Sequence, residues 1–174
     1  MDAGLLEPRD AVLYRVNTAG LEKSGSADLG RMLQAEVVGH VDGDTVRVRI
    51  SNPPAGLSIV ETIRLLGVDT PETVHPNREA ERFGQEASDF TKEALLGKMV
   101  YLAFDWDLRD RYGRLLAYIY TRQGRWQGRC FNAVLIQEGF GHAYLRFPFQ
   151  FMEEFRLLEQ EARREGRGLW SFSR

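Results

Sequence analysis

The clearest pattern in the chain is an alternation of apolar and polar residues that begins at residue 45. Branched apolar side chains occupy every second position over 45–50, which is typical of a strand with one buried face. The sequence Asn-Pro-Pro-Ala-Gly at 52–56 then indicates a turn, and extended character resumes over 59–66. Residues 44–66 are therefore predicted to form a β-hairpin.

A helical pattern follows, because apolar residues recur at alternating steps of three and four from Ala80 to Ala94. Gly97 is positioned to end this helix. The remaining predicted elements are strands over 99–104 and 115–120, a short helix capped by Asn132 and ending at Gly139, and a last helix over about 150–165. This order, without regular β-α-β alternation, predicts a small barrel with attached helices.

Two groups of residues are predicted to be structural. Four phenylalanines are expected to pack the last helix against the barrel: Phe147, Phe149, Phe151 and Phe155. Cys130 has no obvious paired base in the sequence, which favours an unreactive thiol.

Composition limits the class of protein. The chain has 174 residues, 43% of them hydrophobic and 28% charged, with a formal net charge of −2, as expected of a globular domain with a single core. A single cysteine excludes a disulfide framework and a multi-cysteine zinc site. No apolar run approaches the roughly 18 residues of a membrane span. The near-zero charge argues against a polycation that coats nucleic acid, but not against a local basic site.

The first 30 residues have a different character from the rest. Residues 12–16 are compatible with a short strand, and residues 20–30 are rich in Gly, Ser and Asp, which indicates a linker. Asp2 and Glu7 stand where a signal peptide needs cations, so no export signal is visible.

Candidate chemistry begins at the sequence Asp-Gly-Asp-Thr over 42–45. Taken alone, Asp-Gly before a strand is a common hairpin turn. The alternative is that Gly43 allows a tight turn from which Asp44 presents its carboxylate to a hard cation such as Ca²⁺.

A second candidate stretch runs from Arg64 to Glu72. One interpretation is purely structural: a strand leads into a turn that contains proline, and the charged side chains are solvated. Arg64, however, lies among apolar neighbours, and three oxygen-bearing residues follow it closely, namely Asp69, Thr70 and Glu72. This set would suit metal-assisted attack on a phosphate.

The third stretch, residues 110–114, places two arginines around a tyrosine. A charged hairpin loop is the ordinary interpretation. Arg111, Tyr112 and Arg114 would also suit contact with a phosphate and a stacked base, because a planar guanidinium can hold two phosphate oxygens.

Together these stretches resemble the thermonuclease family, the staphylococcal-nuclease-like domains. The resemblance runs from about residue 35 to 171, and its motifs occur in one order at compatible spacing. The matching segments are Val41–Thr45, Arg64–Leu66, Val68–Thr73, His75–Pro76, Phe83–Gly84, Glu86–Ser88, Phe90–Lys92, Tyr112–Arg114, Leu116–Tyr120, Asn132–Ala133, Gly139, Ala143–Tyr144 and Trp170–Ser171. The resemblance implies an α+β fold, with a five-stranded OB-type barrel and about three packed helices, in a domain over 31–174 behind a leader at 1–30.

The resemblance also implies a reaction, the hydrolysis of DNA and RNA phosphodiesters to products with 3′-phosphates. Asp44 and Asp69 match the family's carboxylate ligands to Ca²⁺, and Thr70 matches the residue whose backbone carbonyl binds the same ion. Glu72 matches the general base on the attacking water. Whether Glu72 takes the proton or orients the water is open.

Five further positions are implied to contact the substrate. Arg64 and Arg114 match the pair that clamps the scissile phosphate. The residues that match nucleotide-binding positions are Arg111, Tyr112 and Tyr144. We therefore expect a monomeric nuclease that acts on single-stranded or frayed DNA and RNA and does not bind membranes. The resemblance favours a secreted or extracytoplasmic location.

The chain departs from the family pattern at two places. Arg146 stands where the family often has a second tyrosine, and the connection over 121–131 is longer than usual. A different class of function also stays open, since OB-type barrels serve as non-catalytic modules that bind single strands or act as scaffolds. A third hypothesis is that the chain is a nuclease domain that acts as a module within a larger assembly.

Overall fold

The computed structural model describes residues 32–73 and 78–173. The elements in chain order are β1 (Leu33–Asp42), β2 (Thr45–Arg49), β3 (Val60–Leu65), β4 (Val68–Asp69), α2 (Arg78–Leu95), β5 (Met99–Ala103), β6 (Leu115–Thr121), α3 (Phe131–Gln137), β7 (His142–Ala143), α4 (Met152–Glu165) and the 3₁₀ helix η4 (Gly168–Ser173). The predicted leader over 1–30, with its strand at 12–16 and linker at 20–30, lies outside the described residues. The division at residue 31 therefore stays a prediction.

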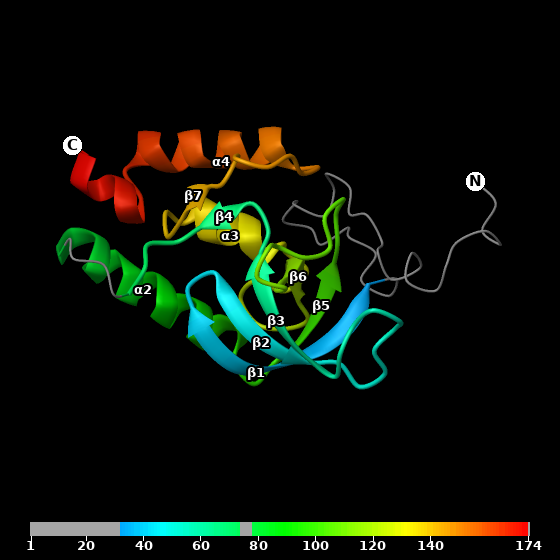
Figure 1. Cartoon of the computed structure of the whole chain (residues 1–174). Coiled ribbons are helices and arrows are strands. Elements are labelled where there is room, and N and C mark those ends of the chain that lie inside the picture. Colours follow the sequence, from blue (N-terminus) through cyan, green and yellow to red (C-terminus); the bar gives the residue numbers. More distant parts are fainter. Residues whose placement is uncertain (1–31, 74–77, 174) are drawn as a thin grey trace.

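Five strands form a closed barrel in the order β1-β2-β3-β6-β5 (Figure 1). Only β3 and β6 pair in parallel, and the other barrel pairs are antiparallel. A separate two-stranded sheet joins β4 to β7. The predicted α+β fold with a five-stranded barrel and three helices is confirmed.

The barrel interior follows the predicted alternation. Val46, Val48 and Ile50 are buried, whereas Arg47 and Arg49 on β2 face solvent. Residues 45–49 pair with 60–64 in a regular antiparallel register, so the predicted hairpin is confirmed. Burying one face of each strand supplies most of the free energy that closes the barrel.

The ten-residue strand β1 was not predicted. Its pairing with β2 is irregular after Val37 and again after His40, so the side chains do not keep a period of two. Such bulges insert a residue and bend the strand, which hides it from a search for alternation.

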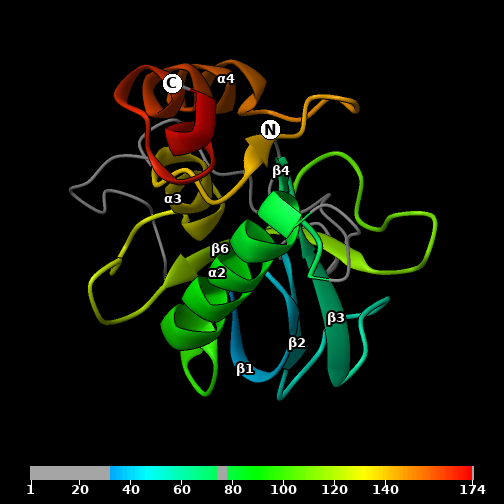
Figure 2. The same ribbon diagram turned by 90° about the vertical axis from the view of Figure 1, so that its left-hand side faces the viewer.

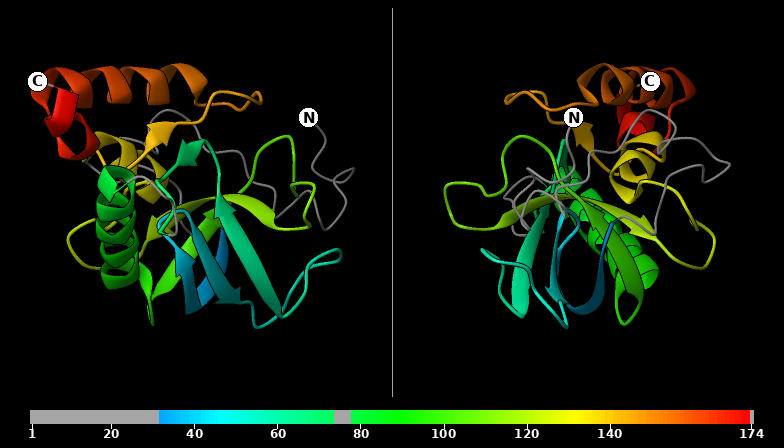
Figure 3. Two further views of the ribbon diagram at one scale, coloured as in Figure 1. Left: turned by 60° about the vertical axis from the view of Figure 1, so that its left-hand side comes forward. Right: turned by 90° about the vertical axis from the view of Figure 1, so that its right-hand side faces the viewer.

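The helices gather at one end of the barrel and along one of its sides (Figures 1 and 2). The helix α2 packs against β1, and α3 lies between β6 and α4. Figure 3 shows α4 farthest from the barrel, with α3 and the β4–β7 pair beneath it. Among the described residues, no helix is long and apolar enough to cross a membrane.

Asn132 is not the helix cap that the sequence predicts. The residue at the N-cap of α3 is Cys130, which makes no side-chain capping bond. The buried Asn132 side chain instead donates to the carbonyl oxygens of Leu66 and Ala117, at 2.8 and 3.0 Å, and accepts from the amide of Ile119 at 3.0 Å. These bonds satisfy backbone groups where β3 ends beside β6, so Asn132 ties α3 to the barrel.

Three of the four phenylalanines pack the last helix as predicted, but one does not. Phe149, Phe151 and Phe155 are buried, whereas Phe147 is 58% exposed. Cys130 is fully buried, and burial raises the pKa of its thiol to about 12. That value keeps the thiol protonated and unreactive at neutral pH.

Candidate active site

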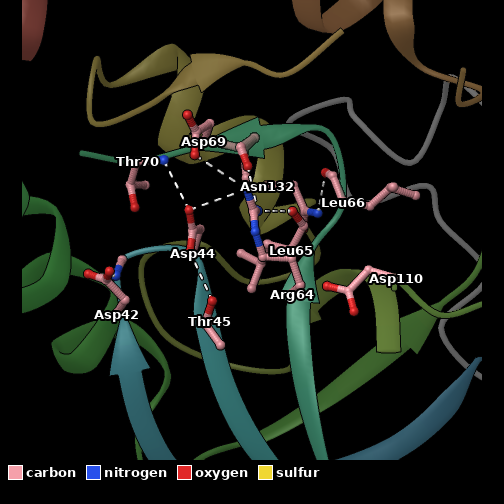
Figure 4. Close-up of polar contacts among 12 residues, drawn as sticks. Asp42, Asp44, Thr45, Arg64, Leu65, Leu66, Asp69, Thr70, Asp110 and Asn132 are labelled. Carbon is pink, nitrogen blue, oxygen red and sulfur yellow. Dashed lines mark hydrogen bonds and ion pairs between the residues drawn. The ribbon is translucent and has the colours of Figure 1, made fainter. Parts of the chain in front are cut away.

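Asp44 lies in the tight turn between β1 and β2 and is held by two hydrogen bonds. Its Oδ1 accepts from the Thr45 hydroxyl at 2.9 Å, and its Oδ2 accepts from the Thr70 amide at 3.1 Å (Figure 4). The side chain is almost fully buried. The second bond links the start of β2 to the segment that follows β4, so two regions distant in sequence meet at one carboxylate.

Gly43 makes this close approach possible. A Cβ atom at residue 43 would lie 2.7 Å from the Thr70 Oγ1 atom and 3.1 Å from the Ala87 Cβ atom. The carbonyl of Gly43 also accepts a 2.6 Å hydrogen bond from the buried Thr91 hydroxyl on α2. The turn is therefore fixed between Thr70 and α2, where a larger residue at position 43 does not fit.

Arg64, near the end of β3, points its guanidinium into the same region. Its Nη1 atom donates to the carbonyl oxygens of Leu65 and Val68, at 2.8 and 2.6 Å. Its Nη2 atom lies 3.5 Å from Oδ2 of Asp44 and 3.4 Å from Oδ1 of Asp69. Figure 4 shows this side chain between the two carboxylates, with the dashed contacts converging on it.

Neighbouring acidic groups raise one another's pKa values in this region. Burial raises the pKa of Asp69, and the charge of Asp44 adds to this, although Arg64 opposes both. Burial also raises the pKa of Asp42, helped by the neighbouring carboxylates of Asp44 and Glu72, while its bond from the Gly43 amide acts in the other direction. Four carboxylates, those of Asp42, Asp44, Asp69 and Glu72, thus influence one another here, and Arg64 contacts two of them, Asp44 and Asp69. This surplus of negative charge favours a bound cation.

Asp42 is the acidic residue that sequence reasoning missed here. It was considered only as part of the turn motif. The sequence did contain a signal that Asp42 belongs to this region. Asp42 and Asp44 are separated only by Gly43, so their carboxylates must lie close together in a tight turn.

The oxygen atoms gathered here suit a hard cation. Among the residues that the structure describes, no three His, Cys, Asp or Glu side chains form a metal-binding group. Asp44 and Asp69 therefore provide two carboxylates at most, and further ligands would come from Thr70, water or substrate. The Thr70 Oγ1 atom is buried without a hydrogen-bond partner among the described residues, which marks an unsatisfied polar position beside the two aspartates.

Glu72 is exposed and follows Thr70 and Pro71 on the same segment. Its backbone rests directly on α2, since a Cβ atom at Gly84 would lie 2.5 Å from the Glu72 carbonyl oxygen. This contact fixes the segment that carries Glu72. The charge of Glu72 contributes to raising the pKa values of Asp42 and Asp69.

A cleft of about 590 Å³ opens beside this acidic region. It is lined by all five residues predicted to contact the substrate: Arg64, Arg111, Tyr112, Arg114 and Tyr144. Asp44, Asp69, Thr70 and Glu72 do not line it. Arg64 belongs to both regions, because its side chain contacts the two aspartates and also borders the cleft.

The loop that carries Arg114 is preorganised by Asp110. One carboxylate oxygen of Asp110 accepts from the amides of Tyr112 and Arg114, at 2.9 and 3.0 Å, and the other accepts from the Arg114 Nε atom at 2.6 Å. Gly113 adopts a φ of 82°, which an L side chain rarely tolerates. Because Asp110 occupies Nε, the two Nη nitrogens of Arg114 remain for an anion in the cleft.

The aromatic residues lie close to these guanidinium groups. The Tyr112 ring centroid lies 4.9 Å from the Cζ atom of Arg111 and 5.4 Å from that of Arg114. The Tyr144 ring lies 5.9 Å from the Cζ atom of Arg64 on the other side of the cleft. Cationic and aromatic groups thus alternate around the cleft, which suits phosphates and bases.

Arg109 also lines the cleft, but it is engaged in a structural ion pair that sequence reasoning missed. Its guanidinium donates two hydrogen bonds to Glu61, at 3.0 and 2.7 Å, and one each to the carbonyl oxygens of Gly56 and Gly113. Burial of Glu61 alone would raise its pKa, but bonds from Arg109 and from the Ser58 amide hold that pKa below its ordinary value. Arg109 therefore stabilises the loop that carries Arg114, by linking the Gly113 carbonyl oxygen to Glu61 on β3.

Comparisons with known proteins agree with this geometry. A family model described as Staphylococcal nuclease homologue matches residues 62–172. The chain is 36% identical over 138 residues to a thermonuclease of Staphylococcus hyicus, covering 78% of this chain and 75% of that protein. It is 37% identical over 156 residues to a thermonuclease of Staphylococcus intermedius, covering 88% and 83%.

A further relative is named as an endonuclease, YncB, from Bacillus subtilis (strain 168). It is 38% identical over 136 residues, which cover 76% of this chain and 59% of YncB. The expected resemblance is thereby confirmed over most of the chain. With the barrel, the cleft and the acidic region in place, the chain belongs to the staphylococcal nuclease family.

Proposed function

We propose that this chain is a Ca²⁺-dependent phosphodiesterase that hydrolyses DNA and RNA and leaves 3′-phosphates. Membership of the family and similarity to named thermonucleases and an endonuclease support a nuclease. The observation that carries the proposal is the position of Arg64, whose guanidinium contacts Asp44 and Asp69 and also lines the cleft that holds Arg114. A phosphodiester in the cleft would therefore lie beside the acidic region.

A phosphodiester is an anion that repels hydroxide, so hydrolysis needs charge neutralisation, an activated water and support for the added charge of the transition state. Asp44, Asp69 and the Thr70 backbone carbonyl would hold Ca²⁺, which would neutralise phosphate charge when bound. The remaining requirements fall to this chain's own side chains.

Arg64 and Arg114 would stabilise the transition state by donating hydrogen bonds to the phosphate oxygens. Each is already oriented by bonds to the protein, Arg64 by two carbonyl oxygens and Arg114 by Asp110, so little reorganisation is needed. Removing one such donor costs about 2.7–4 kcal/mol of transition-state stabilisation in comparable sites.

Glu72 would act on the attacking water. Its backbone is held against Gly84, and its side chain is exposed, so a water molecule can reach the carboxylate. A positioned general base contributes roughly 10²–10⁴-fold to rate. The same geometry allows Glu72 to orient the water without taking its proton.

The test compares the wild-type protein with Glu72→Gln on denatured DNA and on RNA, with Ca²⁺ and with a chelator. We expect cleavage with Ca²⁺, none with chelator, 3′-phosphate ends, and a loss of at least 10²-fold in the variant. Glu86→Gln, an exposed residue on α2, is the control and should keep full activity. Cleavage that survives the chelator would remove the calcium assignment, and binding without cleavage would favour the non-catalytic module.

A further inference from the structure

The connection between β6 and α3 carries a concentration of positive charge. Arg122, Arg125 and Arg129 lie close together in the sequence, and residues 121–131 contain no aspartate or glutamate. The whole chain has a formal net charge of −2, so this concentration is local. The connection is also the one that is longer than usual for the family, which means that the charge lies on a segment particular to this chain.

A fourth cation lies beside the tip of this connection. A Cβ atom at Gly124 would lie 4.0 Å from the Nζ atom of Lys98. We call Lys98, Arg122, Arg125 and Arg129 the basic cluster. Within 32–73 and 78–173, none of these four side chains forms an ion pair with a carboxylate. Their charge is therefore uncompensated in the part of the chain that the structure describes.

The backbone that presents the arginines is folded back on itself. The Gly128 amide donates to the Thr121 carbonyl oxygen at 2.9 Å, and the Arg129 amide donates to the Trp126 carbonyl oxygen at 3.0 Å. The Thr121 hydroxyl donates to the same Trp126 oxygen. These bonds hold the connection in one shape before any ligand arrives, which lowers the entropy lost on binding.

Trp126 anchors the connection and orients two of its cations. The Trp126 ring packs edge-on against Phe90 of α2, with 6.0 Å between the ring centroids. The Cζ atoms of Arg125 and Arg129 lie 4.5 and 5.7 Å from the centre of the Trp126 ring. A guanidinium held over a ring keeps the N–H groups at its edge for an anion. Arg125, which is exposed, is therefore restrained and still able to donate.

The basic cluster lies far from the cleft. Figure 2 shows the connection beside α2, on the opposite side of the barrel from the loop that carries Arg114, and the right-hand view of Figure 3 agrees. A globular domain of about 140 residues is roughly 35–40 Å across. Stacked nucleotides follow one another at about 3.4 Å along a strand. A ligand that reaches both places is therefore a polymer of at least about ten nucleotides.

We propose that the basic cluster binds the phosphate backbone of a polynucleotide whose scissile bond lies in the cleft. Charge complementarity favours this partner, because a nucleic acid presents phosphates in a continuous row to arginines that have no carboxylate partner in the described residues. This inference rests on the proposed function. The second contact makes long substrates bind more tightly than short ones without touching the reacting atoms.

The test measures kcat and KM of the double variant Arg122→Gln with Arg125→Gln on a strand of about 40 nucleotides and on one of about five. We expect KM on the long strand to rise about threefold to tenfold with kcat unchanged. The short strand cannot reach the basic cluster, so its KM should stay the same. Arg47→Gln with Arg49→Gln removes two exposed arginines from β2 and is the matched control, which should leave both KM values unchanged.

Salt dependence gives an independent measurement. Anisotropy of the fluorescent long strand yields the binding constant at several salt concentrations. The slope of its logarithm against log salt should be smaller by about 1.4 in the double variant, as expected for two lost phosphate contacts on a single strand. Arg122 and Arg125 are exposed, so the variant should fold normally, and an unchanged melting temperature checks this.

Three results would overturn the proposal: an unchanged KM on the long strand, an equal rise on both strands, or the same rise in the β2 control. Arginines beside a tryptophan also suit anionic lipid head groups. If phosphatidylglycerol vesicles bind the wild type and not the double variant, while binding of the long strand is equal in both, the basic cluster is a lipid surface and the proposal is rejected.

Failure of the proposed function would look different. If the wild-type chain cleaves nothing, anisotropy of the long strand still compares the double variant with the wild type and with the β2 control. Weaker binding in the double variant alone would uphold the basic cluster while hydrolysis is rejected. Equal binding in all three proteins would reject the basic cluster.

Discussion

The two arginines proposed to clamp the phosphate, Arg64 and Arg114, are held in different ways, and this affects what each substitution would do. Arg64 is fixed by backbone carbonyl oxygens and lies between two aspartates, whereas Arg114 is fixed by Asp110 through its Nε atom. Arg114 therefore depends on the planar shape of the guanidinium, with one edge bound to Asp110 and the other facing the cleft.

Arg114→Lys should lower kcat by about 10²–10³-fold although the charge is kept, because lysine cannot bond Asp110 and two phosphate oxygens together. Steady-state kinetics on denatured DNA measures the loss. Arg156→Lys is the matched control, since Arg156 also pairs with a nearby carboxylate, Glu153, but on exposed α4. Near-wild-type turnover in Arg114→Lys would contradict the clamp.

Glu61→Gln should destabilise the protein in a pH-dependent way. The pKa of Glu61 is lowered in the folded state, so its ion pair with Arg109 stabilises the protein above the unfolded-state value of about 4.3. That contribution is lost as pH falls through the folded-state value. At pH 7 we expect the free energy of unfolding to drop by about 1–3 kcal/mol.

Urea unfolding across pH 3–8 provides the check, and the gap between wild type and variant should shrink below about pH 4. Glu93→Gln, an exposed residue on α2, should show no such gap. A constant difference at all pH values would mean that Glu61 acts through packing alone.

At the scale of the elements, the position of the segment that carries Glu72 depends on a glycine in a helix. Gly84 lies within α2, where the lack of a Cβ lets the Glu72 backbone approach. Sequence patterning placed this helix correctly, with Gly97 after it at a φ of 78°. It treated Gly84 only as part of a family motif, because the contact joins residues whose proximity appears only in the folded chain.

Gly84→Ala should impair catalysis, although alanine normally stabilises a helix by about 1 kcal/mol relative to glycine. The new Cβ atom would lie 2.5 Å from the Glu72 carbonyl oxygen, so the segment must shift. We expect kcat to fall at least tenfold and the melting temperature to drop. Glu86→Ala, on the exposed side of the same helix, should do neither. A more stable and fully active Gly84→Ala would contradict the contact.

Over the whole molecule, the topology assembles the acidic region from separate strands. Asp44 lies in the β1–β2 turn, Arg64 lies near the end of β3, and Asp69 ends β4. The pairing of Thr45 with Arg64 across β2 and β3 brings the first two together. The carboxylates gathered there repel one another, so we expect a bound cation to stabilise the folded chain.

Adding Ca²⁺ should therefore raise the melting temperature without any substrate. At ten times the dissociation constant, the expected stabilisation is about 1.4 kcal/mol. Asp44→Asn should remove most of the shift, whereas Asp107→Asn, an exposed residue of the cleft, should keep it. Differential scanning calorimetry at several Ca²⁺ concentrations makes the comparison. A shift that survives Asp44→Asn would place the ion elsewhere.

The sequence by itself determined the barrel hairpin and the three helices, because side-chain periodicity and local turn chemistry act between near neighbours. The proposed site residues came from the resemblance of its motifs to a known family. Only the tertiary structure showed the Glu61–Arg109 pair, the bonds of Asn132 and the exposure of Phe147. Each of these depends on residues that are separated along the chain or on which face of a segment is covered. Such contacts are set by how strands pair and helices pack, and no local pattern encodes them.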